Sequence, residues 1–193
     1  MENKQDNELM YLVAEKNTQA LKIIYKRYEM RVFNFIYRYT GSRGVAQELI
    51  QETFTRLWFS AHLFDERKGN FKGWLYTMAL NITRNEMSKK EYLYGFKGMD
   101  ETVQHLSTNN NGARETPERI FEESETRNSV INALTQLKPY IREVIILKNY
   151  DHLKFKEIAE VTGAPEGTVK ARYLKGIDIL KGILNPKEVI NHV

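Results

Sequence analysis

The chain of 193 residues contains no cysteine, which excludes disulfide scaffolds, thiolate zinc sites, iron–sulfur clusters and thiol nucleophiles. Its four histidines, His62, His105, His152 and His192, show no metal-binding spacing, so we expect no metal site. Neither a glycine-rich phosphate loop nor a catalytic triad spacing is present, and we expect no enzymatic activity and no cofactor. The sequence also lacks any run of about 18 apolar residues, and its polar N-terminus has no export signal. These absences predict a cytoplasmic protein that does not insert into a membrane.

Charge is distributed unevenly along the chain. Residues 1–90 carry 15 basic and 10 acidic side chains, residues 91–126 carry 3 and 8, and residues 127–193 carry 11 and 7. The middle segment contains an asparagine run and three glycines and shows no sustained apolar period. We predict two basic domains, 1–90 and 127–193, joined by a flexible acidic linker over 91–126, with the first helix of the second domain starting near residue 117. Two basic domains on a tether are suited to hold one long polyanion at two points.

Apolar residues recur at steps of three and four, which predicts an all-α fold, and no strand-like alternation occurs. One amphipathic stripe runs from Leu9 to Tyr37 and ends at the break formed by residues 40–44. A second helix is predicted around 49–58, and a third from Phe71 to about residue 90. Further helices are predicted at 117–136, 139–149, 154–162 and 165–184, where Thr116-Pro117 is a favourable helix start.

The segment 155–174 has the spacing of a helix-turn-helix. Ala159 is the small residue needed where two helices cross, Gly163 tolerates a positive φ at the turn, and Val169 anchors the second helix. On that helix we expect one face to be buried, formed by Val169, Tyr173, Gly176, Ile177 and Leu180. The exposed face would then hold the candidates for contacts in a DNA major groove, namely Thr168, Lys170, Ala171, Leu174 and Lys175, with Arg172 at its flank. The alternative is an ordinary helical hairpin whose basic residues only solvate a surface.

Three motifs carry a family resemblance. Residues 46–58 read AQELIQETFTRLW, residues 71–81 read FKGWLYTMALN, and the C-terminal half has Leu137, Arg142, EIA at 157–159 and EGTVKAR at 166–172. In this order they resemble regions two and four of the bacterial extracytoplasmic-function (ECF) sigma factors. The resemblance covers roughly residues 9–90 and 118–184.

This resemblance implies three binding faces. A polymerase-docking face would comprise Glu48, Leu49, Gln51, Glu52 and, partly exposed, Phe54 and Trp58, although core packing is the favoured explanation for the two aromatic residues. A surface for the melted −10 strand would comprise Asn81, Arg84, Asn85, Lys89 and Lys90, with stacking help from Phe71, Trp74 and Tyr76. For Lys89 and Lys90, a run of solvated surface charges is as good an explanation as DNA binding. The helix-turn-helix face given above would contact the −35 element.

The sequence departs from the family pattern in places. Val45 and Gln47 stand where the family commonly has acidic residues. Polymerase docking would therefore depend more strongly on Glu48 and Glu52. The segment after Arg172 loses basic charge, and Lys154 and Pro165 replace helix-capping serines. The chemistry of loop 63–72 is not assigned by the sequence.

The resemblance implies a transcription initiation factor whose partners are core RNA polymerase, promoter DNA and an anti-sigma factor. In many relatives the anti-sigma factor is anchored in the membrane. The factor itself is expected to be a monomer. Two other functions are compatible with the sequence. One is a stand-alone helix-turn-helix regulator with an N-terminal sensing or dimerisation domain, and the other is a helical enzyme or scaffold with an incidental hairpin.

Overall fold

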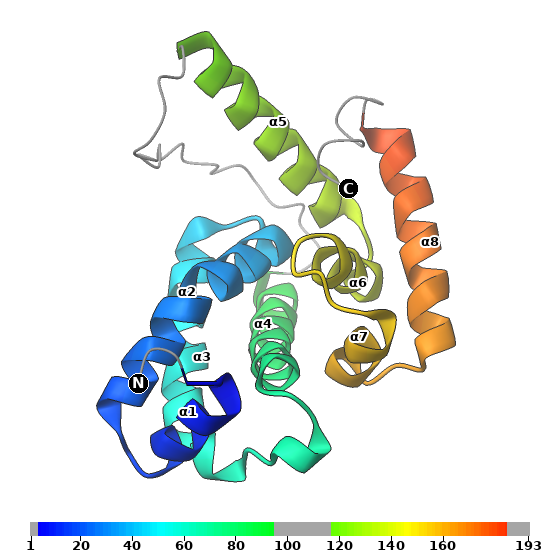
Figure 1. The fold of residues 1–193 in the computed structure, drawn as a ribbon. Helices are drawn as coiled ribbons and strands as arrows, with labels where there is room; N and C mark the ends of the chain where they lie inside the picture. Colours follow the sequence, from blue (N-terminus) through cyan, green and yellow to red (C-terminus); the bar gives the residue numbers. More distant parts are fainter. Residues whose placement is uncertain (1–3, 95–116, 185–193) are drawn as a thin grey trace.

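The structure is a computed structural model that describes residues 4–94 and 117–184, with side chains described for 4–90 and 127–184. Within these ranges it is all-helical and contains no strand, which confirms the predicted fold class (Figure 1). The helices are α1 (Asp6–Ala14), α2 (Thr18–Thr40), α3 (Arg43–Ser60), α4 (Phe71–Tyr94), α5 (Pro117–Gln136), α6 (Pro139–Asn149), α7 (Phe155–Thr162) and α8 (Glu166–Ile183). Two short 3-10 turns, η1 (Ala61–Leu63) and η2 (Glu66–Lys68), lie between α3 and α4. We call α1–α4 the N-terminal domain and α5–α8 the C-terminal domain.

The first apolar stripe was predicted as one helix, and this prediction is wrong. The helix ends at Ala14, Lys16 has a positive φ of 64°, and Asn17 starts α2 by accepting a hydrogen bond from the amide of Ala20 at 3.0 Å. Asparagine favours this capping position. The apolar period continues across the break because α1 and α2 contribute to the same core, so periodicity alone did not reveal it.

The second predicted break is confirmed. Gly41 ends α2 with a φ of 73°, in the left-handed region that glycine enters without strain. The side chain of Ser42 then accepts a hydrogen bond from the amide of Val45 and caps the start of α3.

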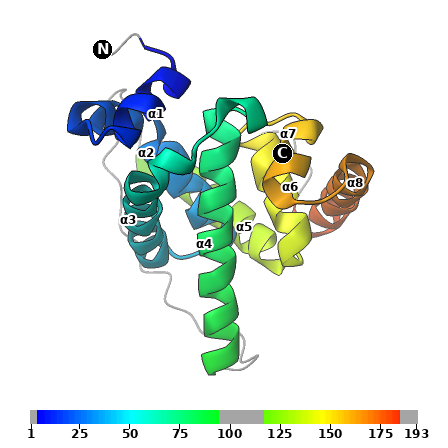
Figure 2. The ribbon, with the colours of Figure 1, turned by 90° about the horizontal axis from the view of Figure 1, so that it is seen from below.

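The long helix α4 lies between the two domains. The helices α1–α3 pack on one of its sides and α7 on the other, and its C-terminal end projects beyond its neighbours (Figure 2). The helix α6 packs on α2 and reaches α4 through the Arg84–Glu143 pair. The buried apolar residues of both domains form one continuous core. The domains therefore pack against each other, which the sequence did not predict.

The helix-turn-helix is formed as its spacing predicts. Gly163 ends α7 with a φ of 70°, and α8 starts after three residues. Val169, Gly176 and Leu180 are buried, while Tyr173 and Ile177 are half-buried. The buried face of α8 packs on α6.

At the start of α7 no serine cap is present, and a glutamate replaces it. A carboxylate oxygen of Glu157 accepts a hydrogen bond from the amide of Lys154 at 2.7 Å. This is the reach-back half of a capping box, and it pairs the amide of Lys154 rather than the first-turn amides that a serine would bind.

Most of the predicted linker, 95–116, lies outside the described residues. Its ends, 91–94 and 117–126, have helical backbone as parts of α4 and α5. No helix within the described ranges is both long enough and apolar enough to cross a membrane.

The contact between α6 and α8 predicts a strong position-specific effect. A methyl group on Gly176 would lie 2.7 Å from Cδ1 of Ile145 and 2.8 Å from Cγ2 of Ile141, both in fully buried side chains. We expect Gly176→Ala to lower the free energy of unfolding by about 1–2 kcal/mol, because overpacking costs roughly 1–3 kcal/mol and helix propensity returns up to about 1 kcal/mol. Chemical denaturation followed by circular dichroism measures the change. The matched control is Gly182→Ala in the same helix, where nothing lies within 4 Å; equal stability of the two variants would contradict the prediction.

Candidate nucleic-acid interface

The predicted duplex-binding residues share one exposed face near the start of α8. Thr168, Lys170, Ala171, Leu174 and Lys175 are exposed, and Arg172 is half-buried with its guanidinium over the ring of Tyr140 at 5.1 Å. Lys170 forms an ion pair with Glu166 at 2.7 Å. An exposed ion pair of this kind contributes little to stability. A DNA phosphate can therefore replace the Glu166 carboxylate as the partner of Lys170. Leu174, 69% exposed, presents an apolar group between two lysines.

The predicted single-strand-binding residues divide into two groups along α4. Asn81, Asn85 and Lys89 are exposed, and Lys90 is half-buried and forms an ion pair with Glu86 at 3.6 Å. Arg84 lies on another side of the helix, facing the C-terminal domain, where it forms a two-bond ion pair with Glu143. The structure thus brings three of the predicted residues together at the surface and holds Arg84 in an internal contact.

Two of the three aromatic residues predicted to stack on bases are buried, so this part of the prediction is corrected. Phe71 packs edge-on against Tyr28 and Phe64 in the core of the N-terminal domain. Tyr76 is fully buried and faces the C-terminal domain. The third, Trp74, is half-buried and packs against Phe64 and Phe71.

On α3 the predicted docking face is also corrected. Glu48, Gln51 and Glu52 are exposed as expected, but Leu49 and Phe54 are buried, and the ring of Phe54 packs against Tyr25 with centroids 4.7 Å apart. The predicted partial exposure of Phe54 is therefore wrong. Trp58 is half-buried, with the ammonium of Lys16 4.9 Å from its ring centroid.

Two exposed apolar residues near this face were missed. Phe59 is 67% exposed and Leu63 is 66% exposed. Phe59 follows Glu52 by seven positions, so it continues the exposed acidic side of α3 rather than its buried side. Extending the helical period past Trp58 would have found it.

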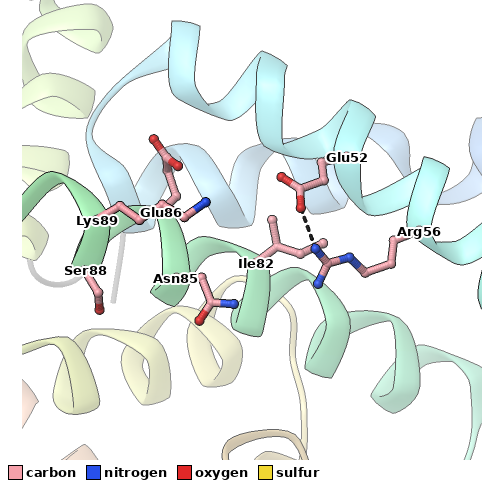
Figure 3. Close-up of a pocket in the computed structure, with 7 residues that line it drawn as sticks. All are labelled: Glu52, Arg56, Ile82, Asn85, Glu86, Ser88 and Lys89. Atoms are coloured by element: carbon pink, nitrogen blue, oxygen red, sulfur yellow. Dashed lines mark hydrogen bonds and ion pairs between the residues drawn. The ribbon is translucent and has the colours of Figure 1, made fainter.

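A groove of about 410 Å³ between α3 and α4 joins two of the predicted faces. It is lined by Glu52, Arg56, Ile82, Asn85, Glu86, Ser88 and Lys89 (Figure 3). Glu52 and Arg56 form an ion pair across one turn of α3 at 2.6 Å. The groove contains both carboxylates and cations, so it offers amide, hydroxyl and charged groups rather than a purely basic track for phosphates.

The contact between the domains is rich in polar groups. Arg84 binds Glu143 at 2.7 and 3.1 Å, and Lys72 donates a hydrogen bond to the carbonyl of Asp151 at 2.6 Å. The hydroxyl of Tyr76 donates to the carboxylate of Asp151. On α2, the guanidinium of Arg38 lies 4.0 Å from the ring centroid of Tyr150 in the C-terminal domain.

The environment of Asp151 shifts its ionisation. Burial raises the pKa of the Asp151 carboxyl to about 6, against opposing effects of the Tyr76 hydroxyl and of the cations Lys72, Arg38 and Arg31 from α4 and α2. Burial also raises the pKa of Tyr76, so its hydroxyl stays protonated and donates.

Within the described residues no group of three histidines, aspartates or glutamates lies close enough to hold a metal ion.

Comparison with known proteins identifies the class. Residues 24–91 match the family description "Sigma-70 region 2", and residues 127–178 match "Sigma-70, region 4". Together the two segments cover more than half of the chain, one in each domain. The chain therefore belongs to the sigma-70 family.

Individual relatives place it more narrowly, in the ECF group of that family. The chain is 28% identical over 182 residues to the ECF RNA polymerase sigma factor SigK of Mycobacterium sp. (strain JLS), covering 91% of this chain and 89% of that relative. It is 29% identical over 176 residues to the ECF RNA polymerase sigma factor SigW of Bacillus subtilis (strain 168), covering 88% and 91%. It is thus a transcription initiation factor. The stand-alone regulator and the incidental scaffold lose their support, because both halves match one family.

Solved structures share the fold. The structure of CnrH in complex with the cytosolic domain of CnrY matches with a TM-score of 0.67 at 21% identity, over 92% of this chain and 95% of that chain. The sigma factor RpoE from Bartonella quintana, solved with the anti-sigma factor NepR, matches with a TM-score of 0.65 at 21% identity, over 84% and 94%.

The raised pKa of Asp151 predicts a pH dependence of stability. In the folded protein this carboxyl binds a proton more readily than in the unfolded chain, so its burial costs least when it is protonated. The wild type should therefore gain about 1 kcal/mol of unfolding free energy between pH 7 and pH 5, relative to Asp151→Asn, whose amide does not titrate. Denaturant titrations of both proteins at the two pH values measure this difference, and parallel responses of the two proteins would refute it.

Proposed function

We propose that this sigma factor binds core RNA polymerase through the exposed side of α3, reads the −35 element with α8 and holds the melted −10 strand along the exposed side of α4. In this proposal the functional domains are residues 1–90 and 127–193. The single observation that carries the proposal is the two-sided character of α8. One side of α8 is buried in the core of the C-terminal domain through Val169, Gly176 and Leu180. The other side is exposed and basic.

The α8 face has the chemistry of a major-groove reader. Lys170 and Lys175 are exposed cations that can bind phosphates or base edges, and Leu174 between them can contact a thymine methyl group. The helix starts immediately after the turn of the helix-turn-helix, so its first turns are free to enter the groove.

The α4 side supports single-strand binding through a smaller set than the sequence predicted. Asn81 and Asn85 offer amide groups for unpaired bases, and Lys89 offers a cation for the backbone. Trp74 is the remaining aromatic residue with an accessible edge, which suits stacking.

The α3 side supports protein docking. Exposed Glu48 and Glu52 are followed along α3 by Phe59, which is also exposed. An apolar anchor beside charged groups is the composition of a protein interface, and its acidic character suits a basic partner. We include Phe59 in this face in place of the buried Leu49 and Phe54.

The remaining assignments follow from the class. We propose that the protein is a cytoplasmic monomer without enzymatic activity of its own. Opening of the DNA is then driven by binding energy that the factor shares with polymerase. An anti-sigma factor is a further proposed partner, supported by the solved structure of similar fold of RpoE, which was determined with the anti-sigma factor NepR.

The docking face is tested by Glu52→Lys. We expect about tenfold weaker binding to bacterial core polymerase, because the substitution places a cation where the face is acidic. Binding is measured by fluorescence anisotropy with labelled protein. The control is Glu160→Lys, the same charge change at an exposed position of α7. The α3 assignment fails if both variants bind like the wild type.

The −35 face is tested by Lys170→Glu in run-off transcription with core polymerase and a panel of promoters. We expect about tenfold less transcript, since a lost phosphate or base contact in the upstream element costs roughly 1–3 kcal/mol. Lys181→Glu, in the last turn of the same helix, changes the charge equally and should keep wild-type activity. Unchanged initiation with Lys170→Glu would remove α8 from promoter recognition.

A further inference from the structure

The turn between α1 and α2 reaches the end of α3. Lys16, in the middle of this turn, donates a hydrogen bond from its ammonium group to the backbone carbonyl of Trp58 at 3.0 Å, across 42 positions of sequence. The same ammonium lies 4.9 Å from the ring centroid of Trp58 and 5.9 Å from that of Phe59. One side chain from the turn thus contacts both aromatic residues in the last turn of α3.

The end of α3 has an electrostatic need for this ammonium. The described last turn of α3, up to Ser60, contains no basic residue of its own. The last carbonyls of a helix have no partners further along the helix, and together they form the negative end of the helix dipole. A cation is therefore favourable at this end, and Lys16 supplies it from outside the helix.

The backbone of Lys16 is also unusual. Its φ is 64°, in the left-handed region that glycine or asparagine normally occupies after the end of a helix. A lysine in this conformation carries backbone strain that a glycine would avoid. Strained conformations persist where the surrounding structure holds them, and the contacts of the Lys16 side chain with α3 provide such a hold.

The contact with Phe59 bears on docking. Phe59 is 67% exposed and belongs to the proposed docking face of α3. An exposed side chain that becomes ordered only on binding loses conformational freedom, which weakens the affinity, whereas a side chain ordered beforehand avoids this loss. The ammonium of Lys16 restricts the Phe59 ring by a cation–π contact on one side of the helix end.

Building on the proposed function, we propose that Lys16 is a positioning residue for polymerase docking: it holds the end of α3 so that Phe59 is ordered before polymerase binds. Lys16 acts through Phe59 and need not contact polymerase itself. It precedes residue 24, where the match to sigma-70 region 2 begins. The docking surface thus depends on a turn that lies outside the matched segment.

The first experiment measures binding of the full chain to core polymerase by fluorescence anisotropy. Lys16→Met keeps the apolar stem and removes the ammonium, so we expect about fivefold weaker binding. Lys16→Arg supplies a donor and a cation that stacks on aromatic rings, and should bind within about twofold of the wild type. The matched control is Lys22→Met, at an exposed lysine of α2, which should bind like the wild type. Wild-type affinity of Lys16→Met, or an equal loss in Lys16→Arg, would overturn the proposal.

A double variant tests whether Lys16 acts through Phe59. Phe59→Ala removes the aromatic anchor and should weaken docking about tenfold. In that background Lys16→Met should cause no further loss, because the ring that it positions is gone. Additive losses from the two substitutions would contradict a positioning role.

A glycine variant separates positioning from stability. Lys16→Gly relieves the strained backbone, so it should resist denaturant better than Lys16→Met while binding polymerase equally weakly. If Lys16→Gly binds clearly better than Lys16→Met, affinity follows stability and the positioning role is refuted.

The second experiment reports the contact in the free protein. The chain has two tryptophans, Trp58 and Trp74, so Trp74→Phe leaves Trp58 as the single fluorescent reporter. In this background we expect Lys16→Met to raise the acrylamide quenching constant of Trp58, and Lys16→Arg and Lys22→Met to leave it unchanged. Equal quenching in Lys16→Met would show that the ammonium does not hold the end of α3.

Failure of this proposal and failure of the proposed function give different results. If Phe59→Ala weakens docking and Lys16→Met does not, the role of Lys16 is wrong and the α3 docking face stands. If Phe59→Ala and Glu52→Lys both bind like the wild type, the α3 face itself is wrong and the role of Lys16 fails with it.

Discussion

The arrangement of the helices depends on one buried guanidinium. Arg142 in α6 donates hydrogen bonds to the carbonyls of Leu134, Thr135 and Leu137 at the end of α5, and to the carbonyl of Tyr39 near the end of α2. The last carbonyls of a helix lack partners within it, and arginine offers five donors in a fixed fork. One side chain thus completes α5, fixes the turn into α6 and ties the C-terminal domain to the N-terminal one.

The two arginines at the contact between the domains have different kinds of partner. Arg142 is 7% exposed and its donors are occupied by backbone carbonyls, so burial keeps it out of reach of a ligand in solution. Arg84, on the neighbouring side of the interface, binds a carboxylate that a phosphate can replace. The interface thus combines a buried arginine held by backbone carbonyls with a half-buried arginine held by a carboxylate. Three of the Arg142 contacts lie within the C-terminal domain, and the fourth, to the Tyr39 carbonyl, joins it to the N-terminal domain.

The sequence predicted those features that depend on local rules. Gly163 at the turn and Gly176 facing α6 followed from backbone freedom and helical spacing. Leu49 and Phe54 were assigned to docking because an acidic-apolar motif does not show which of its apolar residues face the core. Phe59 was missed because the motif was read only as far as Trp58. The Arg84–Glu143 pair joins residues 59 positions apart. No local pattern encodes such a pairing, so the closed packing of two domains predicted as tethered appeared only in three dimensions.

The closed packing changes how the basic charge of the N-terminal domain should be understood. Counted along the sequence, Lys72 and Arg84 add to an excess that attracts a polyanion. In the folded protein Arg84 is neutralised by Glu143, and burial lowers the pKa of Lys72, whose ammonium is occupied by the Asp151 carbonyl. The attraction available to DNA is then concentrated on α8 and on the free end of α4. The charge counted along the sequence therefore overstates what the side of α4 that faces the C-terminal domain presents to solvent.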